Sequence, residues 1–209
     1  WMNDAEGNPQ TYLRDASGNP VYSGAVQVHG QNYNLTGSSS PFNATREKLT
    51  HLMHGLSLKS NTQGEWDWEL AASLYDYAQD QLRRTTVISA ASFNGGNGTL
   101  TDQNGTGWMT LVARGTWRPQ GVKGAHIVDF GAQQDVYRLR ILTSAVTGNW
   151  LSDAPGTVNS DVGGETRTLA LYAQDTWNFA PRLKTVLGAR LENWNAHSGT
   201  TYNSTSTPA

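Results

Sequence analysis

Several features that define common protein classes are missing from this sequence. It contains no cysteine, which excludes disulfide scaffolds, thiolate metal sites and cysteine nucleophiles. Only 15% of its 209 residues are charged and the formal net charge is −2, so the basic surface of a nucleic-acid-binding protein is lacking. No apolar run approaches the roughly 20 residues of a membrane-spanning helix. A membrane-spanning β-strand needs only about 10 residues with every second one apolar, so a membrane location is still open.

The residues that are abundant favour strands and turns. The chain is rich in Thr, Ser, Asn and Gly and contains eight Trp and eight Tyr, whereas the residues that usually fill helices are scarce. In the clearest strand, 66–77, mostly polar residues alternate with Trp66, Trp68, Leu70, Ala72 and Leu74. This period of two predicts a strand with one apolar face, because an amphipathic helix would repeat its apolar residues at intervals of three and four.

Alternating segments of this kind come in pairs and predict three hairpins. We expect the hairpins at about 46–78, 107–140 and 166–195. Short turns close them, at 61–65, 119–124 and 180–182, and long polar loops join them, at 79–107 and 143–165. Short turns at one end and long loops at the other are typical of an outer-membrane β-barrel, with turns in the periplasm and loops outside the cell.

Tryptophan residues near the short turns support a membrane-spanning barrel. Trp66, Trp68, Trp117 and Trp177 all lie close to these turns, where an interfacial aromatic girdle is expected. A soluble sandwich or lectin domain could also combine strands with polar turns, but it rarely needs such long strands or such unequal connections. The fold class that we predict is all-β, an antiparallel transmembrane β-barrel.

The third hairpin carries the most specific motif. Residues 168–177 read Thr-Leu-Ala-Leu-Tyr-Ala-Gln-Asp-Thr-Trp, and Pro181 and the stretch 187–194 follow. This motif resembles the barrel of TonB-dependent outer-membrane receptors, and the similarity extends over roughly 46–195. The resemblance implies a receptor in the outer membrane of a Gram-negative bacterium. It would import a scarce ligand, most often a ferric siderophore, through a barrel of 22 strands that an N-terminal plug domain closes.

The resemblance also predicts that the chain is one part of such a receptor. No plug domain, no TonB box and no terminal strand that ends in an aromatic residue is recognisable, and about seven strands cannot close a barrel of that size. We therefore expect residues 1–209 to form an interior part of the barrel domain. The resemblance implies contact with the TonB system through the plug, and contact of the barrel with outer-membrane lipid and lipopolysaccharide.

Candidate ligand-binding residues gather where the strands approach the long loops. They are Tyr75, Tyr77, Arg83, Arg84, Trp108 and Trp194. Arginine and aromatic side chains suit anionic, partly aromatic chelates through charge-assisted hydrogen bonds and cation–π contacts. The alternative interpretation is that these residues pack the loops, anchor the interface or contact lipopolysaccharide phosphates.

Charged residues on the polar sides of the strands are expected to face the barrel lumen. They are Glu69, Arg114, Arg190 and Glu192. They either take part in transport or form a hydrated wall against the plug domain.

Catalysis and metal binding find little support. His51 and His54 are the only close histidine pair, and at three residues apart on a strand they point to opposite faces. No Gly-x-Ser-x-Gly elbow and no phosphate-binding glycine loop is present, so we expect no catalytic residue, cofactor or metal site. Two similar segments, 4–9 and 15–20, predict turns rather than calcium loops, because each offers one carboxylate at a probable ligand position.

Two further functions are open at this stage. A receptor of this kind could import another ligand, such as a cobalamin, a saccharide or another metal complex. A secreted β-rich binding module is the alternative from a different class of protein.

Overall fold

The computed structural model describes residues 2–3, 9–10, 24–28, 30–34, 44–86, 95–180 and 182–204. Every element among them is a β-strand, and no helix in this part of the chain is long and apolar enough to cross a membrane. The two segments predicted to be turns rather than calcium loops lie outside the described residues, apart from Pro9.

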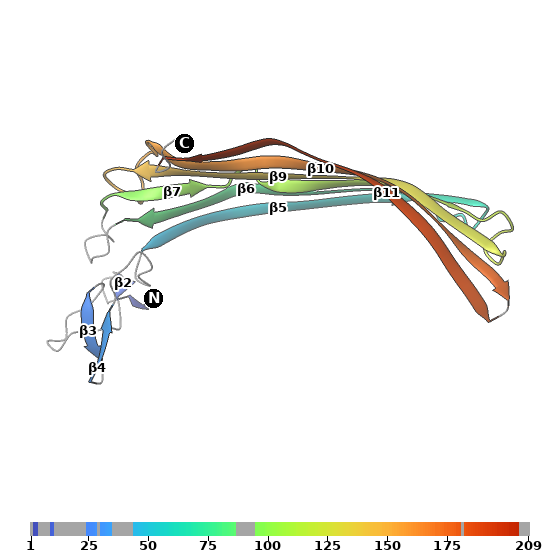
Figure 1. Cartoon of the computed structure of the whole chain (residues 1–209), viewed down its shortest axis with the longest axis horizontal. Coiled ribbons are helices and arrows are strands. Elements are labelled where there is room, and N and C mark those ends of the chain that lie inside the picture. Colours follow the sequence, from blue (N-terminus) through green and yellow to red (C-terminus); the bar gives the residue numbers. More distant parts are fainter. Residues whose placement is uncertain are drawn as a thin grey trace.

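Seven strands form one antiparallel sheet (Figure 1). They are β5 (Thr45–Lys59), β6 (Trp66–Thr85), β7 (Gly98–Asp102), β8 (Gly107–Trp117), β9 (His126–Val146), β10 (Val158–Ala180) and β11 (Leu183–Asn203). Their order is β11-β10-β9-β7-β6-β5, and β8 lies beyond the end of β7 in the same place between β6 and β9. Two small ladders pair β1 (Met2–Asn3) with β2 (Pro9–Gln10) and β3 (Ala25–Val28) with β4 (Gln31–Asn34).

The large sheet is elongated and curved, and it is open. Figure 1 shows the long strands side by side, with the short turns of all three hairpins at one end of the sheet. Within the described residues, β5 pairs only with β6 and β11 pairs only with β10. The sheet therefore has two free edges, and these residues alone do not close a barrel.

The two faces of the sheet differ as the alternation predicts. One face, which we call the apolar face, carries large side chains that are strongly exposed, including Leu56 at 75%, Leu171 at 56% and Leu191 at 75%. The opposite or polar face carries residues such as Glu69 and Arg114, which pair across β6 and β8. Exposed apolar surface of this extent is typical of a protein whose apolar face contacts lipid or a partner rather than water.

The apolar side chains form a band that crosses the hydrogen-bonded rows of the sheet obliquely. Leu74 on β6 pairs with Met109 on β8, and Met109 pairs with Val136 on β9, but the next residue in this row is Arg167 on β10. On β10 the apolar residues of this face begin at Leu169, which is two residues closer to the short β10–β11 turn than Arg167. An oblique band is expected when tilted strands cross a flat layer of hydrocarbon.

The predicted loops are wrong in their extent. The segment 79–107 contains the end of β6 and all of β7, and the segment 143–165 contains the end of β9 and the start of β10. Both segments are rich in polar residues and glycine, and this composition predicts loops. Ladder hydrogen bonds join main-chain groups, however, and a strand that has water on both faces needs no apolar side chain. The strands therefore extend beyond the apolar band.

A small buried cluster lies at the end of the sheet opposite the short turns. Among the described residues, the buried hydrophobic side chains are Ala44, Leu100, Val146, Trp150 and Ala170, and all but Ala170 belong to this cluster. Ala170 lies in the middle of β10 on the polar face, opposite Gln133 and Glu192. Gly98 lies against Trp150, and a Cβ atom at this glycine would approach the Trp150 side chain to 2.4 Å. The cluster fixes the connection between β9 and β10 against the end of β7.

Candidate functional site

Four aromatic side chains on the polar face form a cluster near the long-connection end of the sheet. Tyr75 on β6 pairs with Trp108 on β8, and Tyr77 pairs with His51 on β5. The rings of Tyr75 and Trp108 stack with centroids 4.2 Å apart and planes 15° apart. Those of His51 and Tyr77 stack at 3.9 Å and 9°. We call His51, Tyr75, Tyr77 and Trp108 the aromatic cluster.

A chain of polar contacts holds the aromatic cluster in place. The ring nitrogens of His51 lie 2.9 Å from the Tyr75 hydroxyl, through Nδ1, and 2.8 Å from Asp80 Oδ2, through Nε2. Asp80 is 8% exposed, and its Oδ1 also accepts a hydrogen bond from Gln103. The imidazole is therefore fixed between a phenol and a carboxylate, and the rings have defined positions before any ligand arrives.

One extra residue in β6 decides which side chains can join this cluster. Tyr77 pairs with His51 and Gln79 pairs with Thr50, so Ala78 has no partner residue on β5. Such a β-bulge shifts the alternation by one position. Asp80 consequently points to the same face as Tyr75 and Tyr77, although simple alternation from Tyr77 would place it on the other face.

Adjacent residues of a strand point to opposite faces, and the same shift decides which of the two predicted site arginines shares the face of Tyr75 and Tyr77. Arg83 lies three positions after Asp80 and points to the opposite face, where its Nη1 donates hydrogen bonds to the main-chain oxygens of Trp150 and Asp153 at 2.9 Å each. Arg84 lies on the face of Asp80 and is exposed. The predicted loop at 79–107 would place both arginines beyond the strand, but β6 includes them and continues to Thr85.

Trp194 lies on the polar face but far from the aromatic cluster. It pairs with Thr168 of β10 and is 64% exposed on β11, the strand at the free edge. The structure thus brings together Tyr75, Tyr77 and Trp108, places Arg84 on the same face, and separates Arg83 and Trp194 from them.

His51 and Asp80 are the members of this site that the sequence did not indicate. The sequence singles out His51 only as a neighbour of His54, and the two do point to opposite faces, since His51 pairs with Tyr77 and His54 pairs with Leu74. Asp80 fell in a predicted loop. The alternation of β5 predicts which face His51 points to. Its place opposite Tyr77 follows only from the register of β5 against β6.

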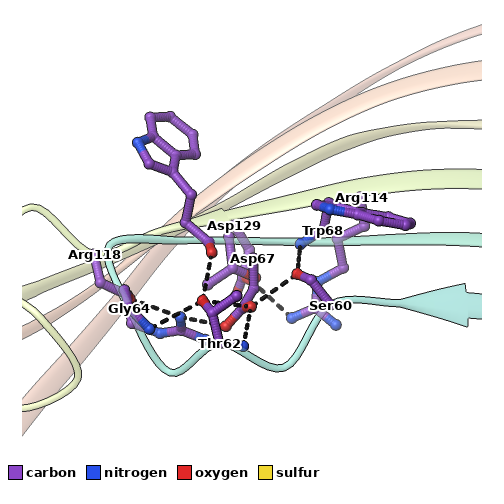
Figure 2. A network of polar contacts seen from close by, with 10 residues as sticks. Ser60, Thr62, Gly64, Asp67, Trp68, Arg114, Arg118 and Asp129 are labelled. Carbon is purple, nitrogen blue, oxygen red and sulfur yellow. Dashed lines mark hydrogen bonds and ion pairs between the residues drawn. The ribbon is translucent and has the colours of Figure 1, made fainter.

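A second polar network on the same face lies at the β5–β6 turn (Figure 2). Asp67 accepts hydrogen bonds from the Ser60 hydroxyl and the Thr62 amide at 2.8 Å and from Arg118 Nη1 at 2.7 Å. Nearby, Asp129 accepts hydrogen bonds from Arg114 Nη2 at 2.8 Å and from the Thr116 hydroxyl at 2.6 Å. Both carboxylates are 9% exposed and are occupied by protein donors. Both oxygens of Asp67 and the Oδ1 of Asp129 thus accept hydrogen bonds from the protein, and the network stabilises the turn end of the sheet.

The charged residues predicted to face the lumen share the polar face. Glu69 pairs with Arg114, and Arg190 forms an ion pair with Glu192 and donates a hydrogen bond to Gln133. Among the residues that the structure describes, no three His, Asp or Glu side chains are grouped so that they could hold a metal ion. The aromatic cluster therefore offers rings and hydrogen-bonding edges, and Arg84 lies about 20 Å further along the same face.

The comparison with protein families decides what this sheet belongs to. The family model described as "TonB dependent receptor-like, beta-barrel" matches residues 2–209. The chain belongs to the TonB-dependent receptors. The family resemblance of the third hairpin is thereby confirmed. A search of curated proteins finds no match.

Membership of this family gives the protein its location and its general role. TonB-dependent receptor barrels lie in the outer membrane of Gram-negative bacteria, and their role is TonB-dependent transport rather than catalysis. The exposed apolar face of this receptor is then the face that contacts lipid, which accounts for the exposure of its leucines.

Proposed function

We propose that this sheet is one arc of a closed receptor barrel of 22 strands, which surrounds a plug domain and imports a ferric siderophore. The free edges of β5 and β11 support closure, because unpaired main-chain groups are costly in hydrocarbon and must find partners. In this proposal, the short turns lie in the periplasm and the β9–β10 connection lies outside the cell. The polar face lines the lumen, and the TonB system acts on the receptor through the plug.

The observation that carries the ligand proposal is the pair of ring stacks in the aromatic cluster. Tyr75 stacks on Trp108 and Tyr77 stacks on His51. Both pairs lie on the polar face, which in this proposal lines the lumen, at the end where a ligand from outside would arrive. Arg84, on the same face, supplies a positive charge for an anionic chelate. In this proposal Arg83 orients the β9–β10 connection, and Trp194 contacts the ligand only from a more distant part of the wall.

A saccharide is the second candidate ligand. Aromatic rings stack on the flat faces of sugars, and the fixed edges of His51 and Asp80 could bond to hydroxyl groups. A cobalamin or another metal complex has no specific support from the contacts of this cluster. The siderophore is preferred because Arg84 adds a cation, which a neutral sugar does not need.

Equilibrium binding to the purified full-length receptor tests this proposal. Ferric siderophores of the catecholate and hydroxamate classes are titrated against the receptor and its Trp108→Ala and Tyr75→Ala variants, together with neutral oligosaccharides. Tyr172→Ala is the matched control, since Tyr172 lies on the polar face nearer the short turns. We expect a ferric siderophore to bind, the two cluster variants to weaken its binding, and the control to retain it. Unchanged affinity in both cluster variants would contradict the proposed site, and binding of a saccharide alone would contradict the proposed ligand.

A further inference from the structure

The strand β9 reverses the sides of its apolar and charged residues beyond the apolar band. Nearer the short turn, Phe130 and Val136 point to the apolar face. Further along the strand, Arg138 and Arg140 occupy the apolar face, and the large apolar side chains lie on the polar face. We call these apolar residues of β9 and their neighbour on β10 the inner apolar strip: Tyr137, Leu139, Ile141 and Val162.

Lipid does not account for the inner apolar strip. The strip lies on the face opposite the lipid, and at the same level the apolar face carries the ion pair of Arg138 with Glu165. Charged side chains are costly in hydrocarbon, so this level of the sheet lies beyond the hydrocarbon layer. Tyr137 and Leu139 are nevertheless 50% and 44% exposed. Exposed apolar surface that lipid does not cover is typical of a binding site.

The inner apolar strip begins directly beside the aromatic cluster, because Tyr137 pairs with Trp108. A hollow of about 510 Å³ lies at this junction. Its lining includes six residues that all alternate onto the polar face: Trp108, Tyr137, Leu139, Gly164, Thr166 and Ala196. Its other lining residues are neighbours of these along the same strands. Small residues on β10 and β11 thus lie beside large apolar ones on β8 and β9.

Polar residues limit the strip in both directions along the strands. Toward the short turns the next pair on the polar face is Asp135 with Thr168, and toward the long connection it is Thr143 with Ser160. The Cα atoms of Tyr137 and Ile141 are about 13–14 Å apart along β9. The strip is therefore narrow and of limited length, as an extended hydrocarbon chain is.

The connection between β9 and β10 does not cover the strip. Arg83 points to the opposite face of the sheet, where its Nη1 donates hydrogen bonds to the main-chain oxygens of Trp150 and Asp153. These contacts hold the connection on the outer side. The strip thus stays accessible from the lumen next to the rings of the aromatic cluster.

We propose that the ligand of this receptor is an acylated ferric siderophore. Its chelating part contacts the aromatic cluster, and its hydrocarbon chain lies along the inner apolar strip. Ligand sites commonly combine apolar walls with a few polar groups that orient the ligand, and the strip and the cluster supply these two parts side by side. This inference rests on the proposed function, because it names the class of siderophore that binds at the same site.

Equilibrium binding of ligands that differ only in chain length tests the inference on the purified full-length receptor. Two series are titrated, one with a ferric hydroxamate headgroup and one with a ferric catecholate headgroup, each carrying an acetyl, hexanoyl, decanoyl or tetradecanoyl chain. The strip variant is Leu139→Gln/Ile141→Gln. Leu142→Gln is the matched control, because Leu142 follows Ile141 on β9 and points to the opposite face. Heat-modifiable migration on gels verifies folding, and one detergent is used throughout.

We expect the affinity of the wild type for one series to rise about two- to fourfold with each added methylene group, because each one leaves water for the strip. The rise should stop when the chain is longer than the strip. The strip variant should lose most of this rise and should bind the acetyl member as the wild type does. Leu142→Gln should show the same rise as the wild type.

The possible failures can be told apart. Affinity that does not change with chain length in the wild type would overturn the inference and leave the siderophore proposal intact. A rise that persists in the strip variant would also overturn it, because the chain would then bind detergent or another surface. Equal weakening of every member, including the acetyl one, would assign the strip to packing within the receptor, such as contact with the plug. If no member of either series binds, the proposed function fails and the inference fails with it.

Discussion

His51 is the residue through which the aromatic cluster is connected. It stacks on Tyr77, contacts the Tyr75 hydroxyl and contacts Asp80, so three side chains depend on one imidazole. The one carboxylate among these partners, Asp80, is buried and already bonded to the imidazole. These contacts therefore fix the positions of the rings rather than attract a charged ligand. The contribution of His51 is therefore to hold the rings in position.

Replacing His51 with alanine should weaken both the fold and ligand binding. Asp80 is nearly buried and would lose its imidazole partner, which costs about 1–3 kcal/mol. Urea unfolding in lipid vesicles measures this loss, and ligand titration measures the effect on binding. His54→Ala is the matched control, because His54 lies on the opposite face of the same strand. Equal effects of the two substitutions would show that the contacts of His51 do not matter.

Two residues near the middle of β6 test which face contacts lipid. Leu70→Arg places a cation on the apolar face and should cost about 2–4 kcal/mol near the middle of the membrane. Ser73→Arg lies on the polar face, opposite Thr110, and should cost much less unless the plug packs there. The free energy of refolding into lipid vesicles compares the two variants. Similar penalties would contradict the assignment of the faces.

At the scale of elements, the β5–β6 turn shows how one carboxylate organises a hairpin. Asp67 receives hydrogen bonds from Ser60 and Thr62 on one side of the turn and from Arg118 beyond the end of β8 (Figure 2). The turn is thereby tied to the neighbouring hairpin. A polar turn of this kind depends on these contacts because no apolar core lies beneath it.

Asp67→Ala should destabilise this end of the sheet, since the partly buried Arg118 would lose its charged partner. Asp67→Asn keeps one acceptor oxygen and should lose less than the alanine variant. Urea unfolding of the receptor in vesicles measures the free energy of unfolding of both variants. Lys123→Ala, a substitution in the β8–β9 turn, is the control. An alanine variant as stable as the control would contradict the role assigned to Asp67.

The strands themselves could be predicted only where one face is apolar. Alternation located every hairpin around its short turn, because lipid on one side imposes a period of two. Beyond the apolar band this signal ends although the ladder continues, so the sequence predicts loops where the structure has β7 and the start of β10. Tyr75, Tyr77 and Trp108 could be grouped from their positions, whereas Asp80 and Arg83 could not, because Ala78 shifts the alternation and nothing in the sequence marks it.

At the scale of the whole molecule, the orientation of the sheet can be tested directly. Because the chain contains no cysteine, single cysteines can be introduced at Ser152 and Lys123 and labelled with a membrane-impermeant maleimide. We expect Ser152→Cys, in the β9–β10 connection, to react in intact cells. Lys123→Cys, in the β8–β9 turn, should react only after permeabilisation. The reverse pattern would invert the proposed topology, and the unsubstituted receptor gives the background.

The free edges of the sheet and the position of the aromatic cluster lead to one account of the whole receptor. The arc is completed by further strands, lipid covers its apolar face, and the ligand enters along the polar face past Tyr75 and Trp108. Transport through such a barrel needs both the ligand contact and the TonB system. The account fails if either is dispensable.

Uptake of an iron-labelled siderophore by intact cells tests this central claim most directly. Cells that express the full-length receptor, or its Tyr75→Ala/Trp108→Ala variant, are compared with and without TonB. The account predicts uptake with the wild-type receptor and TonB, little uptake without TonB, and strongly reduced uptake with the variant at equal receptor abundance. Uptake that is the same without TonB, or the same with the variant, would contradict it.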